Sequence, residues 1–220
     1  MNPITTILFD MDGVIADSET HWSRIDTELL ARYGHVYTDE HKRHVMGKSF
    51  PLSSGYYIET FALPMTTQQL TDERKIIARG YYAVHIEPFA HAERVLDWLR
   101  DNGLKIGLAT SAESSLALPF LERHDLLRHF NALTTGEEVI HGKPAPDIYL
   151  LAAEKLNATP ENCLVVEDAL AGVQAGKSAQ MHVAAIPDAH FVNVADYVGF
   201  ADHVLENLGE LPALVEKLNK

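Results

Sequence analysis

The chain has 220 residues, a formal net charge of −13, 46% hydrophobic residues and 22% charged residues. This length and composition are those of a globular protein of one or two domains with a sizeable core, and the negative charge argues against general binding to nucleic acids or anionic membranes. The single cysteine, Cys163, excludes an intramolecular disulfide and a cysteine-based zinc site.

The beginning of the chain lacks the features of a targeting segment. No lysine or arginine precedes Arg24, and the early apolar run Ile7–Phe9 has only three residues. We therefore expect neither a secretory signal peptide nor a membrane span, and we predict a cytoplasmic protein.

Short apolar runs alternate with helical patterns along most of the chain. The runs predict strands at 4–9, 104–109, 131–135, 163–166, 182–186 and 202–205, and helices are predicted at 90–101, 114–127, 145–156 and 169–178. Strands that alternate with helices favour a mostly parallel sheet covered on both faces. The sequence therefore predicts an α/β fold with a Rossmann-like parallel sheet.

Residues 18–86 interrupt this alternation after the first strand. Helical periodicity runs through "ETHWSRIDTELLARYG", with Gly34 as its predicted stop, and through a second pattern in which Thr66 and Gln69 suit a capping box. No strand is predicted here. We expect a helical cap at 18–86 and a discontinuous α/β core formed by 1–17 and 87–220.

Polar side chains follow four of the predicted strands or the loops after them. In chain order they are Asp10 and Asp12, Thr110 and Ser111, Lys143, and finally Glu167 and Asp168. In open α/β sheets ligands bind at the carboxyl ends of the strands, so these side chains are expected to lie together. Asp10 and Asp12 leave the strand on the same side, and two close carboxylates disfavour joint ionisation unless a positive group compensates.

These residue types fit a divalent cation and a phosphate group. Mg²⁺ takes oxygen ligands, and Asp10 and Asp168 are its predicted ligands, with Glu167 assisting. Hydroxyl groups and a lysine that face the metal suit a bound phosphate. One aspartate can act as a nucleophile that forms an aspartyl-phosphate, and the second can act as acid and base.

Each of these residues also has an ordinary structural explanation. "DG" is a common turn signal, so Asp10 and Asp12 could be turn residues. Thr110, Ser111 and Asp168 suit the N-termini of helices, and a loop lysine such as Lys143 is usually solvated. The four stretches together favour a functional site over separate turns and caps.

The motifs "DMDGV", "ATS", "KPAPDIY" and "VVEDALAGVQAG", in this order, resemble those of the haloacid dehalogenase superfamily. The resemblance is to its branch of sugar phosphatases and beta-phosphoglucomutase, whose helical cap follows the first motif. For a member of this branch we expect a monomer. It implies that Asp10 attacks phosphorus and that Asp12 protonates the leaving group and then activates water. It further implies that Thr110, Ser111 and Lys143 bind the phosphoryl group, and that Mg²⁺ is held by Asp10, the backbone carbonyl of Asp12, Asp168 and Glu167.

Within that branch, a phosphosugar mutase is the alternative to a phosphatase. The mutase carries a histidine twelve residues after the nucleophile, where this chain has Trp22, with His21 one residue earlier. Where the mutase has "KGVSR", this chain reads "MGKSF" (46–50), so Phe50 replaces an arginine that would bind a second phosphate, although Lys48 is near. The resemblance therefore favours hydrolysis of a small phosphate monoester, such as a sugar phosphate.

Two further classes fit the sequence less well. A dehalogenase of this superfamily uses no Mg²⁺. Asp12 and Asp168 therefore argue against a dehalogenase. A receiver-type phospho-acceptor signalling domain is about half this length, and its acceptor lies on a middle strand. Trp22 and the pair Tyr81–Tyr82 are interpreted as packing residues of the cap, with Trp22 near enough to the first motif to touch substrate.

Overall fold

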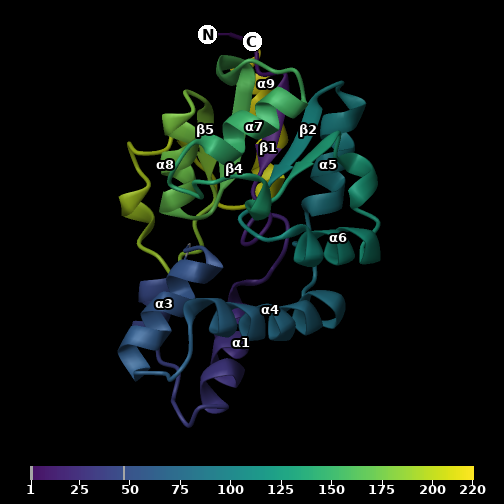
Figure 1. Cartoon of the computed structure of the whole chain (residues 1–220). Coiled ribbons are helices and arrows are strands. Elements are labelled where there is room, and N and C mark those ends of the chain that lie inside the picture. The colour runs from purple at the N-terminus through teal and green to yellow at the C-terminus, as the bar shows by residue number, and fades with distance from the viewer. Residues whose placement is uncertain (1, 47) are drawn as a thin grey trace.

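The computed structural model describes residues 2–46 and 48–220, in which a parallel sheet stands beside a bundle of helices (Figure 1). The six strands described there are β1 (Thr6–Phe9), β2 (Lys105–Ala109), β3 (Ala132–Thr134), β4 (Cys163–Glu167), β5 (His182–Ala185) and β6 (His203–Val204). Their order in the sheet is β3-β2-β1-β4-β5-β6, and all neighbours pair in parallel. The predicted Rossmann-like α/β fold is confirmed.

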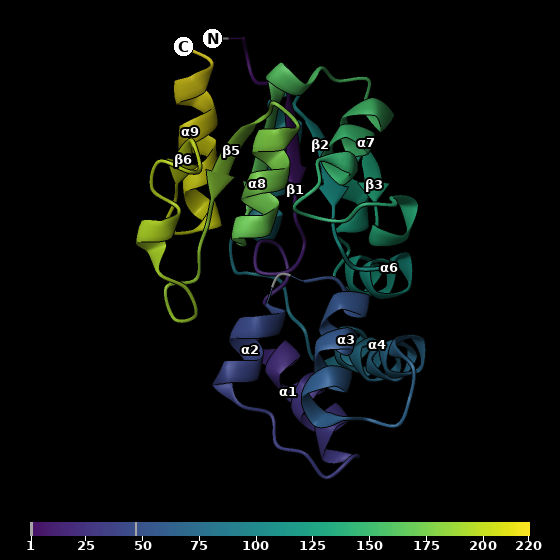
Figure 2. The same ribbon diagram turned by 60° about the vertical axis from the view of Figure 1, so that its left-hand side comes forward.

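The helices of the α/β part cover both faces of the sheet (Figure 2). They are α5 (Ala92–Asp101), α6 (Ser114–Arg123), α7 (Asp147–Lys155), α8 (Leu170–Ser178) and α9 (Leu211–Leu218). Single turns of 3₁₀ helix lie at Leu127–His129, Gly136–Glu138, Pro160–Asn162, Val194–Asp196 and Leu208–Glu210. The four predicted helices are confirmed, whereas α9 was not predicted. In the described part of the chain, no helix has the length and hydrophobicity needed to cross a membrane.

The buried strands are mostly apolar because each face of the sheet is covered. In β1, Ile7 and Phe9 belong to the hydrophobic cluster that includes residues of α5, α6 and α9. Leu8, between them, belongs to the cluster formed with α7 and α8 on the opposite face. This alternation follows from the period of two in a strand, and it directs the next side chain, Asp10, away from the strand at its carboxyl end.

The segment between β1 and α5 forms the helical bundle. It contains α1 (Glu19–Ala31), α2 (Asp39–Val45), α3 (Phe50–Phe61) and α4 (Thr67–Val84), and no strand is found in its described residues. The predicted capping box begins α4: the Gln69 N–H donates to Thr66 Oγ1 at 3.3 Å, and the Thr66 N–H donates to Gln69 Oε1 at 2.9 Å. Gly34 follows the end of α1 with a φ of +77°, as its predicted stop requires.

The chain leaves the sheet and returns to it through two segments that lie side by side. The Asp17 N–H donates to the Glu87 carbonyl at 2.9 Å, and the Phe89 N–H donates to the Ile15 carbonyl at 2.9 Å. These bonds join the two connections between the bundle and the sheet. The division into a cap at 18–86 and a core at 1–17 and 87–220 is consistent with them and stays a prediction.

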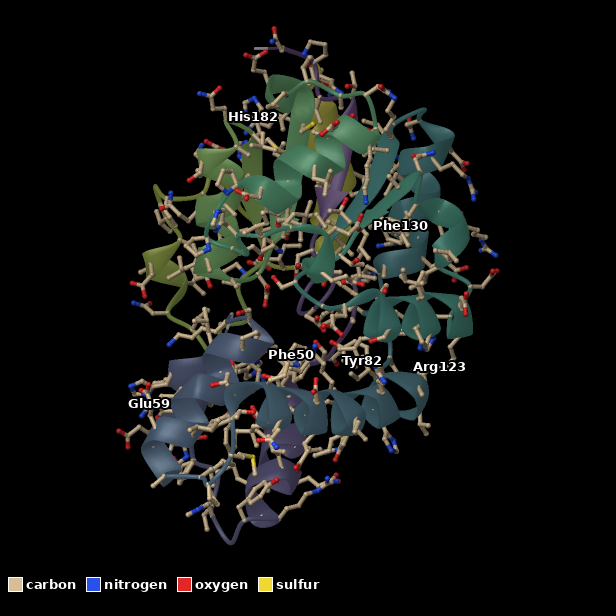
Figure 3. All side chains as sticks on the ribbon, in the orientation of Figure 1. Phe50, Glu59, Tyr82, Arg123, Phe130 and His182 are labelled. Carbon is tan, nitrogen blue, oxygen red and sulfur yellow. The ribbon has the colours of Figure 1, made fainter. Side chains whose placement is uncertain are left out.

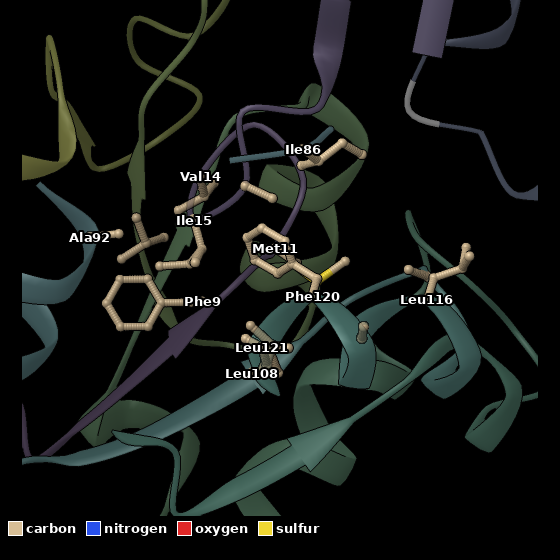
Figure 4. Packing of buried hydrophobic residues seen from close by; sticks show 14 of the residues in the cluster. Phe9, Met11, Val14, Ile15, Ile86, Ala92, Leu108, Leu116, Phe120 and Leu121 are labelled. Atoms are coloured by element: carbon tan, nitrogen blue, oxygen red, sulfur yellow. The ribbon is translucent and has the colours of Figure 1, made fainter. Parts of the chain in front are cut away.

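The first loop anchors this junction through apolar packing (Figure 4). Met11, Val14 and Ile15 are buried, and they share one hydrophobic cluster with Phe9 and with Phe120 of α6. Residues on both sides of Asp10 and Asp12 are therefore held in the interior. The two carboxylates emerge from a rigid loop and not from a solvated turn.

We expect Phe9→Ala to lower the free energy of unfolding by about 3–5 kcal/mol, because it removes a ring that is 0% exposed and leaves a cavity. Val198→Ala, at a side chain that is 70% exposed, is the control and should change stability by less than about 0.5 kcal/mol. Urea denaturation of both variants measures the difference. A loss below about 1 kcal/mol for Phe9→Ala would contradict the packing described here.

Candidate active site

The sheet brings the predicted site residues together at its carboxyl edge. Strand β1 lies between β2 and β4, with Phe9 opposite Leu108 and Val166. Asp10 therefore lies beside the ends of β2 and β4, where Thr110 and Glu167 are found. In a parallel sheet with this order, the crevice at the point where the strand order reverses is the usual place for a ligand.

Lys143 connects two of the predicted carboxylates. Its Nζ donates to Asp10 Oδ1 at 2.5 Å, to Glu167 Oε1 at 2.6 Å and to the Ala109 carbonyl at 3.2 Å. Burial lowers the pKa of this lysine, but the carboxylates of Asp10 and Glu167 outweigh burial and raise it well above its ordinary value. Lys143 therefore stays an ammonium group, which supplies the positive charge that close carboxylates require.

Glu167 accepts hydrogen bonds at both of its oxygens. Besides Lys143, the Tyr149 hydroxyl donates to Oε1 at 2.8 Å, and the N–H groups of Asp168 and Ala169 donate to Oε2 at 3.0 and 3.1 Å. A Cβ atom on Gly172 would lie 1.6 Å from Oε1, so glycine is required there. Glu167 is thus fixed by α7, by the start of α8 and by Lys143.

Asp10, Glu167 and Asp168 form an all-oxygen cluster. One carboxylate oxygen from each lies within 4.8 Å of the other two. Burial raises the pKa of Asp10 to about 7 against the opposing effect of Lys143, and burial together with Glu167 and Asp10 raises the pKa of Asp168 well above its ordinary value. Gly13 has a φ of +78°, and a Cβ there would lie 2.1 Å from Asp168 Oδ2, so this loop approaches Asp168 as only glycine allows. A divalent cation fits this donor set and would relieve its repulsion.

Asp12 points elsewhere, toward the helical bundle. Its Oδ1 accepts a hydrogen bond from the hydroxyl of Tyr82 in α4, and burial raises its pKa. The Tyr82 ring packs edge-to-face on Trp22 and on Phe120. The interpretation of Tyr82 as a packing residue was therefore incomplete, because its hydroxyl also orients the second aspartate of the first motif.

Thr110 and Ser111 differ in their surroundings. Thr110 is buried, and its Oγ1 accepts a hydrogen bond from the Ala112 N–H at 3.0 Å, so the hydroxyl supports the loop while its own proton can still be donated. Ser111 is exposed. Both residues line the same cleft as Asp10 and Asp12. Thr110 can therefore support the loop and also face a bound phosphate.

The cleft lies between the sheet edge and the bundle, where Phe50 and Tyr82 face the α/β part (Figure 3). Its lining on the sheet side includes Asp10, Asp12, Thr110, Ser111, Lys143, Glu167 and Asp168, and on the bundle side Glu19, Trp22, Asp26, Tyr37, Lys42, Lys48, Phe50 and Arg74. Trp22 lines this cleft, and its contact with substrate stays a prediction. Gly47, within the segment 46–50, lies outside the described residues.

Three residues of this region were missed by sequence reasoning. Tyr149 bonds Glu167, while Asp26 and Arg74 form a buried pair in the cleft wall. The only sequence signal for Tyr149 is its place in "KPAPDIY", since a tyrosine on a helix is equally consistent with a packing role. Asp26 and Arg74 are 48 positions apart and lie on two helices, so no local pattern pairs them.

Comparison with known proteins decides the family. Residues 7–186 match the sequence model of the family described as "Haloacid dehalogenase-like hydrolase". The chain belongs to this family. The hydrolase is thus an enzyme of the superfamily that its motifs resemble, and the receiver-type interpretation is not supported.

The relatives of this hydrolase include named phosphatases. It is 33% identical over 179 residues to "Phosphorylated carbohydrates phosphatase" of Thermotoga maritima, covering 79% of this chain and 80% of the relative. It is 30% identical over 216 residues to "Hexitol phosphatase B" of Escherichia coli, covering 96% and 95%. The crystal structure of beta-phosphoglucomutase from Clostridium difficile shares the fold, with a TM-score of 0.83, 23% identity and coverage of 98% of this chain and 97% of that one.

We expect Gly172→Ala to destabilise the hydrolase by about 1–3 kcal/mol, because the added methyl group must displace Glu167 from a fixed position. Gly80→Ala is the matched control: Gly80 lies within α4 with open space around it, so alanine should stabilise the protein by about 0.5–1 kcal/mol. Urea denaturation compares the two substitutions. Equal effects of both would contradict the close packing of Gly172 on Glu167.

Proposed function

We propose that this hydrolase is a Mg²⁺-dependent phosphatase that cleaves a small phosphate monoester, such as a sugar phosphate, through an aspartyl-phosphate. The observation that carries this proposal is the contact of Lys143 with Asp10 and Glu167 in the wall of a cleft that Asp12 also lines. The named activities of the relatives on phosphorylated carbohydrates and hexitols support the substrate class.

In the first step, a carboxylate oxygen of Asp10 forms a bond to phosphorus while the bond from phosphorus to the leaving oxygen breaks. Asp12 donates its proton to that oxygen, so the product leaves as an alcohol. The raised pKa of Asp12 favours the protonated form that this step needs. The hydroxyl of Tyr82 holds the Asp12 side chain toward the cleft.

In the second step, Asp12 takes a proton from a water molecule, whose oxygen attacks phosphorus. The bond between phosphorus and Asp10 breaks, so inorganic phosphate is released, Asp10 is again a carboxylate and Asp12 again carries its proton. Lys143 and the hydroxyls of Thr110 and Ser111 bind the phosphoryl oxygens during both steps. Positioning and neutralisation of charge supply most of the rate acceleration in such reactions.

The acidic cluster fits Mg²⁺, since its donors are carboxylate oxygens within reach of one another. Asp10 and Asp168 would hold the ion, with Glu167 and the backbone carbonyl of Asp12 completing the proposed ligands. When bound, the ion neutralises charge on the phosphoryl oxygens. Glu167 contributes in a second way, because its fixed carboxylate positions Lys143 against Asp10.

Mutase activity is the weaker alternative. Phe50 lines the cleft and packs edge-to-face on Trp22, with 5.5 Å between the ring centroids. An aromatic ring at this place offers no charge to a second phosphate, which a bisphosphate intermediate would carry. The monomeric state and the cytoplasmic location stay predictions.

Replacement of Asp10 by asparagine should lower the rate of phosphate release by at least about 1,000-fold, because the amide cannot form the acyl-phosphate. Asp101→Asn, at an exposed carboxylate on α5, is the control and should retain full activity. Release from a panel of sugar phosphates with Mg²⁺ and with chelator measures both. Undiminished release by Asp10→Asn would overturn the proposed nucleophile, and conversion of one hexose phosphate isomer into another would favour the mutase.

Mg²⁺ should raise the thermal unfolding midpoint of the wild type, because an ion that binds only the folded state stabilises it. Asp168→Asn should abolish this rise while leaving the metal-free protein at least as stable, since it removes one of three close buried carboxylates. Asp101→Asn should keep the full response. An unchanged Mg²⁺ response in Asp168→Asn would contradict the proposed ligand set.

A further inference from the structure

A buried ion pair stands in the bundle wall of the cleft. Arg74 of α4 donates from Nε to Asp26 Oδ1 at 2.6 Å and from Nη2 to Asp26 Oδ2 at 2.9 Å. The Tyr57 hydroxyl adds a third hydrogen bond to Asp26 Oδ2 at 2.7 Å. Arg74 is 5% exposed and Asp26 is 1% exposed, so the pair is almost completely withdrawn from water.

Aromatic rings surround the guanidinium group of Arg74. Its Cζ lies 5.1 Å from the ring centroids of Trp22 and of Phe50, and 5.9 Å from that of Tyr57. Contacts of this kind hold a planar cation by its faces. With its faces against rings and one edge on Asp26, the guanidinium has a fixed orientation and little freedom left to lose when a ligand binds.

One edge of the guanidinium is still available. Arginine carries five N–H donors, and the bonds to Asp26 use one on Nε and one on Nη2. Within residues 2–46 and 48–220, Nη1 makes no hydrogen bond, and it is not among the fully buried atoms that lack a partner. Because Arg74 lines the cleft, Nη1 is the part of the guanidinium that would meet a molecule bound there.

This edge belongs to the side of the cleft where the leaving group must lie. Arg74 packs on Trp22, Trp22 packs on Tyr82 with 5.9 Å between ring centroids, and Tyr82 bonds the proposed acid, Asp12. The phosphoryl group, in contrast, is expected beside Lys143 and Thr110 at the sheet edge. A substrate that spans the cleft from Asp10 therefore presents its carbon skeleton and hydroxyl groups to Trp22 and Arg74.

A structural role alone explains the pair poorly. Burial of an ion pair costs about as much as its attraction returns, so such pairs contribute little to stability compared with apolar residues of the same volume. In a purely structural contact, moreover, the three N–H donors of Arg74 that do not bond Asp26 would have no function. A ligand oxygen accounts for the open edge and for the rigid support behind it.

We propose that Arg74 is a specificity-determining residue that donates hydrogen bonds from its Nη1 edge to an uncharged oxygen of the leaving group. Asp26 cancels the charge of Arg74, so the pair selects a hydroxyl or ring oxygen of a sugar or polyol and not a second phosphate. The proposal rests on the proposed phosphatase activity and names the part of the substrate that the cap recognises.

The test compares a hydroxyl-bearing substrate with one that lacks hydroxyl groups. The value of kcat/KM is measured for glucose phosphate, sorbitol phosphate and p-nitrophenyl phosphate, in the wild type and in the double variant Asp26→Asn/Arg74→Gln, which leaves no unpaired buried charge. The ratio of the best polyol or sugar phosphate to p-nitrophenyl phosphate should fall by about 10- to 100-fold, as expected for loss of hydrogen bonds from a charged donor. Thermal unfolding verifies that the variant is folded.

Tyr57→Phe serves as the matched control. It removes a hydrogen bond to the same carboxylate but leaves the Nη1 edge in place, so the substrate ratio should change by less than about threefold. An unchanged ratio in the folded double variant would overturn the role of Arg74. Preference of the wild type for a hexose bisphosphate over the monophosphates would overturn the proposed selection of an uncharged oxygen.

Binding provides a readout that does not depend on turnover. Calorimetry measures the binding of glucose phosphate, sorbitol phosphate and inorganic phosphate to Asp10→Asn, with and without the double substitution. The double substitution should weaken the binding of the sugar or polyol phosphate that Asp10→Asn binds more tightly. It should leave the binding of inorganic phosphate unchanged. If the wild type hydrolyses no ester, the proposed function fails while this comparison still decides the role of Arg74. Equal affinities with and without the substitution would reject that role.

Discussion

The site depends on one buried ammonium group held between two carboxylates. Lys143 contacts Asp10 at the end of β1 and Glu167 at the end of β4, on neighbouring strands of the sheet. Without this positive charge, the cluster of Asp10, Glu167 and Asp168 would combine strong mutual repulsion with the cost of burial. The bridge also fixes the direction of the Asp10 carboxylate, which a nucleophile requires before a substrate arrives. The remaining repulsion is what makes this end of the cleft suitable for a divalent cation.

The helical bundle contributes to the chemistry through aromatic contacts. The hydroxyl of Tyr82 in α4 donates to Asp12, and the Tyr82 ring packs on Trp22. Trp22 in turn packs on Arg74, which is paired with Asp26. In the proposed reaction, the sheet edge binds the phosphoryl group, while the bundle orients the acid and forms the wall that faces the leaving group. A backbone hydrogen bond between Asp17 and Glu87 joins the two connections between these parts.

The sequence predicted the features that local patterns encode. All six strands follow from apolar runs, and Asp10 and Glu167 could be placed because residues that follow or end parallel strands meet at one edge of the sheet. Helices α2 and α3 were missed, since "DEHKRHV" is polar except for Val45 and α3 contains Pro51 and Gly55. The bonds of Tyr82, Tyr149 and Arg74 could not be predicted, because each joins residues far apart in the chain whose types fit ordinary packing equally well.

Acid quenching of the enzyme during turnover, followed by mass spectrometry, tests the central claim most directly. No lysine or arginine precedes Arg24, so trypsin releases Asp10 and Asp12 in one peptide, and fragment spectra distinguish the two positions. The account predicts a transient phosphoryl group on Asp10 that appears with a sugar phosphate and Mg²⁺ and is lost on longer incubation. A phosphoryl group on another residue, or turnover with none on this peptide, would contradict it.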